Sequence, residues 1–213
     1  MKNEIDKFTA VIFDLDGTLI DSMGIWQEID IKFLNKRGIP VPNNLFDDLK
    51  SNNINALAEH FKEKFALKET IEEIVNEWII EAKHAYEHTI KLKPGAVELL
   101  NYIKTKGKKL AIGTSNERTL TQATLKKHQI YDYFETIVCG CDCERGKPEP
   151  DIFLKIAENL KIPPHECLVM EDSLLGVKAA KNAGMTVYAF ADEYAIDDKE
   201  QIIKIADKYF ESF

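Results

Sequence analysis

Residues Ala10 to Phe13 form a wholly apolar run that ends in two carboxylates, Asp14 and Asp16. Such a run is typical of a strand that is buried on both faces, as in the interior of a parallel sheet. Parallel sheets bind ligands at the carboxyl ends of their strands, where these acids follow. Because residues two apart in an extended chain point the same way, both acids could face one pocket. The alternative is that Asp16-Gly17 only makes a turn.

From Lys93 onward, short apolar runs alternate with stretches of helical period, which predicts a parallel sheet with right-handed crossovers. Beyond the first strand, strands are expected at 109–113, 136–139, 167–170 and 185–190, with helices between them. The tail from Lys199 to Phe213 is predicted to be a closing helix. The fold class is therefore α/β, with a Rossmann-like parallel sheet as its core.

Residues 21–89 interrupt this alternation directly after the first strand and show helical periods only. Four amphipathic helices are expected there, at about residues 22–37, 44–50, 52–65 and 69–88, the first of them capped by Asp21 or Ser22. We interpret this block as a four-helix cap domain, residues 21–89, inserted into a core domain of residues 1–20 plus 90–213. Its two connections, near Ile20-Asp21 and Thr89-Lys93, are expected to lie close together, so that the cap can open and close as a hinged lid.

Polar side chains follow three further predicted strands: Thr114, Lys147 in a loop, and the pair Glu171-Asp172. Because parallel strands end along one edge of a sheet, these groups are expected to converge with the first two acids. Each also has a structural alternative. Thr114 can belong to a helix cap, and Lys147 can be a solvated loop lysine. The acidic pair can simply form the first turn of a helix.

The predicted cluster of four carboxylates requires positive charge. Two carboxylates about 4 Å apart repel each other by a few kcal/mol at an effective dielectric constant near 20. Lys147 supplies one positive charge, and a divalent ion would supply the rest. Carboxylate and carbonyl oxygens suit Mg²⁺ rather than Zn²⁺, and none of the five histidines adjoins these segments.

The overall composition limits the partners. The formal net charge is −8, from 28 basic and 36 acidic residues, which argues against nucleic acid or an anionic membrane surface. No apolar run approaches the roughly 20 residues of a membrane span. Charged residues occupy the amino terminus, where a signal peptide would need an apolar segment, so we expect a cytoplasmic protein.

Three of the four cysteines form the sequence Cys139-Gly140-Cys141-Asp142-Cys143. A metal or redox role is conceivable. However, the spacing is Cys-x-Cys, and no second pair or nearby histidine completes a tetrahedral site. We therefore expect reduced cysteines at the end of a strand.

Four motifs, in this order, resemble those of the haloacid dehalogenase superfamily of phosphotransferases: Asp14-Leu15-Asp16-Gly17-Thr18, Gly113-Thr114-Ser115-Asn116, Gly146-Lys147-Pro148-Glu149-Pro150-Asp151, and Glu171-Asp172-Ser173 with Gly176. They span nearly the whole chain. The helical insertion resembles the cap of the subgroup that contains β-phosphoglucomutase and sugar-phosphate or phosphoglycolate phosphatases. This resemblance predicts the same core fold and a phosphoryl-transfer activity.

The resemblance implies that Asp14 attacks phosphorus and forms an aspartyl-phosphate, and that Asp16 is the general acid and base. It implies a Mg²⁺ ion held by the Asp14 carboxylate, the main-chain carbonyl of Asp16 and Asp172, with Glu171 direct or through water. The non-bridging phosphate oxygens would be bound by Thr114, Ser115 and Lys147. The implied partner is a small phosphorylated metabolite, and we expect a monomer or a weak dimer.

Differences from the motifs of related branches narrow the range of reactions that this chain is expected to catalyse. Dehalogenases lack the acid at Asp16, and the phosphonate-cleaving branch has a small residue there. The mutase branch carries a histidine where Trp26 stands. A phosphatase acting on a sugar phosphate-like metabolite is therefore predicted, with a β-phosphoglucomutase-type hexose-phosphate mutase, and then a non-catalytic phosphate-binding protein, as alternatives. Ser22, Trp26 and His88 are candidate specificity residues, although Trp26 can equally belong to the cap core and His88 can be solvated.

Overall fold

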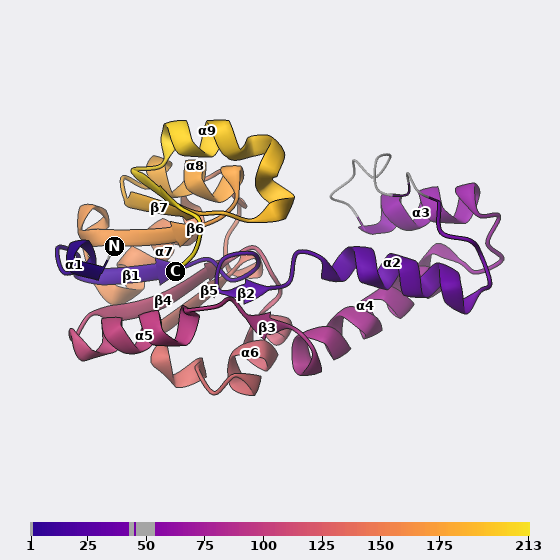
Figure 1. Cartoon of the computed structure of the whole chain (residues 1–213), viewed down its shortest axis with the longest axis horizontal. Coiled ribbons are helices and arrows are strands. Elements are labelled where there is room, and N and C mark those ends of the chain that lie inside the picture. Colours follow the sequence, from indigo (N-terminus) through magenta and orange to yellow (C-terminus); the bar gives the residue numbers. More distant parts are fainter. Residues whose placement is uncertain (1, 43–44, 46–53) are drawn as a thin grey trace. The chain divides into compact units, whose positions relative to one another are not determined.

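A computed structural model describes residues 2–42, 45 and 54–213 of the chain. The chain divides into two compact units, one of Met1–Met23 with Ile90–Phe213 and one of Gly24–Thr89 (Figure 1). We propose that these units are the core and the inserted cap domain.

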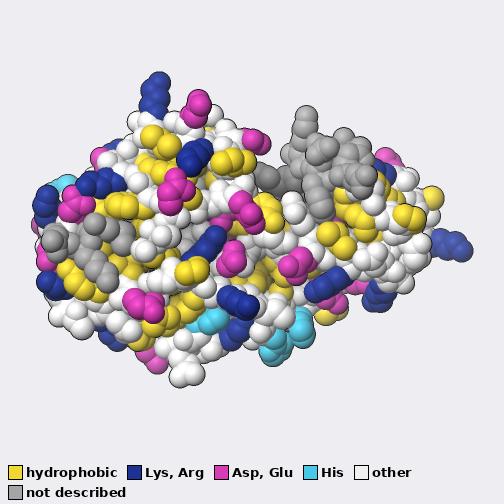
Figure 2. Space-filling model, in the orientation of Figure 1, with side chains coloured by type: hydrophobic (Ala, Val, Ile, Leu, Met, Phe, Trp, Pro, Cys, Tyr) yellow, Lys and Arg dark blue, Asp and Glu magenta, His cyan; other side chains and the backbone are white. Residues whose placement is uncertain are grey.

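In the described ranges, no helix has both the length and the apolar character needed to cross a membrane. On the face seen in Figure 2, Lys and Arg side chains are interspersed with Asp and Glu.

A six-stranded sheet organises the larger unit, in the order β5-β4-β1-β6-β7-β8, and all its neighbouring strands are parallel (Figure 1). This confirms the predicted α/β class and the parallel core. The strands of this sheet are β1 Ala10–Phe13, β4 Lys109–Thr114, β5 Thr136–Cys139, β6 Cys167–Glu171, β7 Thr186–Phe190 and β8 Lys208–Phe210. The helices of the unit are α1 Lys2–Ile5, α5 Ala96–Thr105, α6 Arg118–Lys127, α7 Asp151–Leu160, α8 Leu174–Asn182 and α9 Lys199–Ile205.

Strand β1 lies between β4 and β6, and all four of its residues are fully buried. Ala10 and Ile12 belong to a hydrophobic cluster that includes the apolar faces of α7 and α8. Val11 and Phe13 point to the opposite face, because side chains alternate along a strand. Burying one large apolar side chain contributes about 1.5–3 kcal/mol. Burial on both faces therefore explains why this strand reads as a continuous apolar run.

The parallel arrangement sets the position of the polar residues. Phe13 pairs in register with Ile112 of β4 and with Met170 of β6. Asp14, Thr114 and Glu171 therefore follow these positions by one or two residues, at the same edge of the sheet. The predicted convergence of the strand-end residues follows from this register.

Two short strands join the units. Strand β2, Ile20–Asp21, pairs antiparallel with β3, Lys91–Leu92. The two connecting segments thus run side by side, as the sequence predicted.

The carboxyl-terminal tail differs from its prediction as one closing helix. Helix α9 ends at Ile205, and Lys208–Phe210 forms β8, which pairs parallel with β7. The aromatic rings explain the change, because the ring of Phe210 lies 5.6 Å from the rings of both Tyr188 and Phe190, measured between centroids. Aromatic side chains on neighbouring strands favour strand pairing over a helix.

The smaller unit contains the described helices α2 Ile25–Lys36, α3 Ile54–Lys64 and α4 Ile71–His88. Phe33, Phe61 and Trp78 bring one aromatic ring from each helix into its core, with ring centroids 5.1–6.3 Å apart. The helix expected at about residues 44–50 lies outside the described residues. The predicted cap by Asp21 or Ser22 is wrong, because α2 begins after Gly24 without a side-chain cap and Ser22 instead bonds Asp16.

Asp30 of α2 is a carboxylic acid inside the smaller unit. Its side chain is buried, and it makes no hydrogen bond or ion pair with another described residue. Burial raises its pKa to about 7. Between about pH 4 and pH 7, Asp30 of the folded chain therefore keeps a proton that the same residue of the unfolded chain, with a pKa of about 3.9, has released. The contribution of Asp30 to the free energy of unfolding is therefore most favourable below about pH 4, and it falls by ~1.4 kcal/mol per pH unit up to about pH 7.

We expect Asp30→Asn to remove this pH dependence and to make the chain more stable at pH 8 by a few kcal/mol. Urea unfolding at a series of pH values measures how steeply the free energy of unfolding depends on pH. Glu28→Gln, an exposed position on the same helix, is the matched control and should keep the slope. An unchanged slope in Asp30→Asn would show that Asp30 is not the titrating group.

Candidate active site

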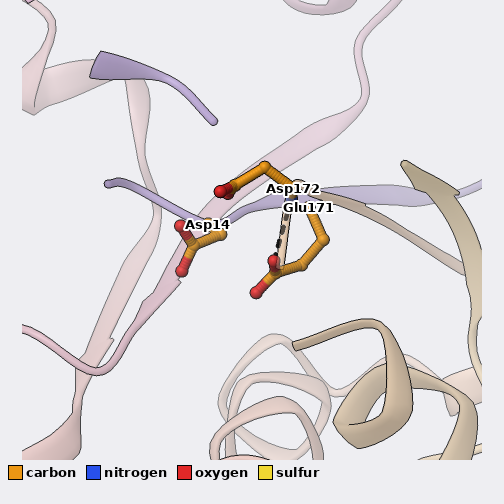
Figure 3. Close-up of side chains that lie close together, drawn as sticks. All are labelled: Asp14, Glu171 and Asp172. Carbon is orange, nitrogen blue, oxygen red and sulfur yellow. Dashed lines mark hydrogen bonds between the residues drawn. The ribbon is translucent and has the colours of Figure 1, made fainter. Parts of the chain in front are cut away.

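Three buried carboxylates lie together at the carboxyl edge of the sheet. Asp14 directly follows β1, Glu171 is the last residue of β6, and Asp172 comes next. One oxygen of each lies within 4.8 Å of the others, and Figure 3 shows the three side chains converging. The strand register therefore brings together acids that are more than 150 residues apart in the sequence.

Lys147 lies among these acids. Its Nζ is 2.6 Å from Oδ1 of Asp14 and 2.5 Å from Oε1 of Glu171, and its side chain is only 6% exposed. It is therefore not a solvated loop lysine. Burial alone would lower the pKa of Lys147, but the two carboxylates raise it above its ordinary value. The lysine thus stays positively charged.

The second oxygen of Glu171 accepts hydrogen bonds from the start of α8. Its Oε2 accepts from the backbone N–H groups of Asp172 and Ser173, each at 2.9 Å, and from the Ser173 hydroxyl at 3.0 Å. Ser173 also caps α8 by accepting from the N–H of Gly176 at 3.1 Å. With Lys147 on its other oxygen, the carboxylate of Glu171 is held on both sides.

The turn after Asp16 lies against Asp172. The Thr18 hydroxyl donates a 2.6 Å hydrogen bond to Oδ1 of Asp172. Gly17 has a φ of +83°, and a Cβ there would lie 2.3 Å from Oδ2 of Asp172. Only glycine fits both the backbone and the space. Thr18 is the last residue of the first of the four motifs, but its contact with Asp172 was not predicted.

Asp16 has a partner on each carboxylate oxygen. The Ser22 hydroxyl donates to Oδ1 at 2.7 Å, and the side-chain amide of Asn116 donates to Oδ2 at 2.9 Å. Asn116 was not among the predicted site residues. It follows Thr114, whose Oγ1 accepts from the Asn116 backbone N–H at 3.0 Å. This bond uses an acceptor position of Thr114 and leaves its hydroxyl hydrogen free to donate.

The electrostatics of the cluster fit a hard divalent cation. Burial, and then the neighbouring charges, raise the pKa of Asp172, and burial raises the pKa of Asp14 although Lys147 opposes it. Three buried carboxylates face one ammonium group, so two negative charges are unbalanced when all of them are ionised. The donors are all oxygen, which Mg²⁺ and similar ions prefer.

The remaining candidate site residues that the sequence predicted are exposed. Ser115 is exposed just past β4. Trp26 and His88 are exposed in the smaller unit, and their contact with a substrate stays a prediction.

Cys139, Cys141 and Cys143 are free thiols at the end of β5. Within the described part of the chain, the acid cluster is the one group of three or more His, Cys, Asp or Glu side chains whose ligand atoms already lie within 4.8 Å of one another.

Residues 11–190 match the family of haloacid dehalogenase-like hydrolases. A phosphorylated carbohydrates phosphatase of Thermotoga maritima is 31% identical over 176 residues, which cover 83% of this chain and 82% of that protein. A (DL)-glycerol-3-phosphatase 1 of Arabidopsis thaliana is 32% identical, over 86% of this chain and 64% of that protein. The crystal structure of a Thermotoga maritima protein described as a "putative beta-phosphoglucomutase" has a TM-score of 0.84 and 29% identity, over 94% of this chain and 93% of that one.

The chain belongs to the haloacid dehalogenase-like hydrolase family. Within that family it is an enzyme of the phosphatase class. The fold and the order of the four motifs agree with this assignment.

Proposed function

We propose that the chain is a Mg²⁺-dependent phosphatase that hydrolyses small phosphorylated metabolites, sugar phosphates above all, through a phosphorylated Asp14. The observation that carries this proposal is a buried carboxylate paired with a buried ammonium group, beside two further carboxylates, where β1 ends. A nucleophile, a charge for the phosphate and ligands for a cation are then next to one another.

We propose that Mg²⁺ is held by the carboxylates of Asp14 and Asp172 and the main-chain carbonyl of Asp16. Both oxygens of Glu171 already accept hydrogen bonds, which favours a role through water. When bound, the ion reduces the repulsion between the nucleophile and the phosphate. Lys147, Thr114 and Ser115 would bind the non-bridging phosphate oxygens, where charge is spread in the transition state.

The reaction has two steps. An Asp14 oxygen forms a bond to phosphorus while the bond from phosphorus to the leaving oxygen breaks, and Asp16 gives its proton to that oxygen. Asp16 then takes a proton from water, the water oxygen bonds to phosphorus, and the bond between phosphorus and Asp14 breaks. Ser22 and Asn116 keep the Asp16 carboxylate in place through both steps.

The names of the relatives support the substrate class. They are phosphatases of phosphorylated carbohydrates and of glycerol 3-phosphate. A mutase is not favoured, because Trp26 stands where that branch has its histidine. We therefore propose a phosphorylated carbohydrate as the substrate.

Phosphate release from a panel of sugar phosphates, glycerol phosphate and an aryl phosphate tests this function. We expect release that requires Mg²⁺ and stops with excess chelator. β-Glucose 1-phosphate with a bisphosphate primer should give free phosphate. Glucose 6-phosphate as the main product would show a mutase, and phosphate binding without any turnover would contradict the proposal.

Asn116→Ala is expected to slow hydrolysis of an alkyl phosphate by about tenfold or more, since a misplaced Asp16 protonates the leaving oxygen poorly. The kcat/KM for 2,4-dinitrophenyl phosphate should change little, because kcat/KM reports on the first step and this leaving group departs without a proton. Comparison of kcat/KM for the two substrates measures this difference. Asn159→Ala, which removes an exposed asparagine that bonds Thr136, is the matched control. Equal losses on both substrates would show that Asn116 acts only on folding or binding.

A further inference from the structure

Helix α4 carries two histidines one turn apart, His84 and His88. Residues four apart on a helix lie on the same face. The two rings are 4.8 Å apart between centroids, and both residues are exposed. No step of the proposed phosphatase reaction uses them.

The surroundings of this pair favour a cation. Oε2 of Glu87 lies 3.9 Å from Nε2 of His88, and Oε1 of the same carboxylate lies 3.9 Å from Nζ of Lys83. Glu81 precedes His84 by three residues and so lies on the same face of α4. His88 is the last residue of α4, where the carbonyl groups at the end of a helix attract positive charge. The sequence His84-Ala85-Tyr86-Glu87-His88 also has the His-x-x-Glu-His spacing with which some helices present two imidazoles to zinc.

The chemistry of this pair differs from that of the buried acid cluster. Imidazole nitrogen is a borderline ligand that suits Zn²⁺, Ni²⁺ and Cu²⁺, whereas carboxylates alone suit Mg²⁺. Two imidazoles on one helical turn bind the same ion as a chelate, so the second bond forms at a high effective concentration. The two groups are therefore expected to select different ions.

We propose that His84 and His88 form a binding site for one borderline divalent transition-metal ion, Zn²⁺ or Ni²⁺, with water and a neighbouring carboxylate, Glu81 or Glu87, completing its coordination. This site shares no residue with the proposed Mg²⁺ site and does not depend on the proposed phosphatase activity. The ion would bridge the last turn of α4.

Titration of the full chain with Ni²⁺ and with Zn²⁺, in excess Mg²⁺ to occupy the acid cluster, tests the site. One ion per chain is expected to bind. Either His84→Ala or His88→Ala should weaken that binding by about tenfold or more. The bound ion should also raise the unfolding temperature of the wild type more than that of either variant.

A variant that combines Lys83→His with His84→Ala keeps the number of histidines but separates them by five residues, so that they point to different faces. It is expected to bind as weakly as a single-histidine variant. His165→Ala, at an exposed histidine of the larger unit, should bind as the wild type does. Undiminished affinity in the respaced variant, or in a double variant that combines His84→Ala with His88→Ala, would overturn the proposal. Wild-type binding no tighter than that of the single variants would overturn it as well.

Discussion

Asp14→Asn is expected to lower kcat for phosphate release by about 10⁴-fold or more. The amide has nearly the same shape as the carboxylate, but its nitrogen and oxygen cannot attack phosphorus to give a stable phosphorylated enzyme. The change also removes the negative charge that lies 2.6 Å from Nζ of Lys147. Steady-state hydrolysis of an aryl phosphate with saturating Mg²⁺ measures the loss.

Asp6→Asn is the matched control for this variant. Asp6 forms an exposed ion pair with Lys106, and these residues precede β1 and β4, whereas the site residues follow those strands. Activity should therefore stay within about twofold of the wild type. Unfolding curves for both variants show whether they fold. If folded Asp14→Asn kept a tenth of the wild-type activity, Asp14 would not be the nucleophile.

Gly176→Ala is expected to destabilise the larger unit by about 3 kcal/mol and to abolish most of the activity. Within a helix this change normally stabilises by up to about 1 kcal/mol. Here a Cβ would lie 1.6 Å from Oε1 of Glu171 and 2.0 Å from its Cδ. Glu171 can retreat only by leaving its bonds to Lys147 and Ser173. Packing against the acid cluster therefore outweighs helix propensity.

Gly146→Ala provides the control, because among the described residues no atom outside its two chain neighbours lies within 4 Å of the Cβ that it would add. Gly146 is next to Lys147 in the sequence, and the substitution should leave stability and activity nearly unchanged. Urea unfolding and phosphate release measure both variants. A fully stable and active Gly176→Ala would show that Glu171 has room to move and is not held as described.

The sequence predicts the core well because its signals are local. The run Ala10 to Phe13 is apolar on both faces, which identifies a central strand of a parallel sheet. Once that sheet is assumed, every strand end must meet along one edge. The convergence of Asp14 with Lys147 and Glu171 follows from topology, without any knowledge of side-chain positions.

Contacts between distant segments could not be predicted in this way. The partners of Asp16 come from residues 6 and 100 positions away, Ser22 and Asn116. A polar residue after a strand reads as a helix cap until the neighbouring carboxylate is placed beside it. Strand β8 was likewise missed, since Lys208–Phe210 is too short to show a period and depends on rings supplied by β7.

Chemical trapping of the phosphorylated enzyme tests the central claim most directly. Borohydride reduces an aspartyl-phosphate to homoserine, which mass spectrometry locates in the sequence. We predict homoserine at position 14 when the chain is quenched during turnover of a sugar phosphate with Mg²⁺, and none without substrate. Turnover that leaves Asp14 unmodified while another carboxylate is reduced would contradict the account.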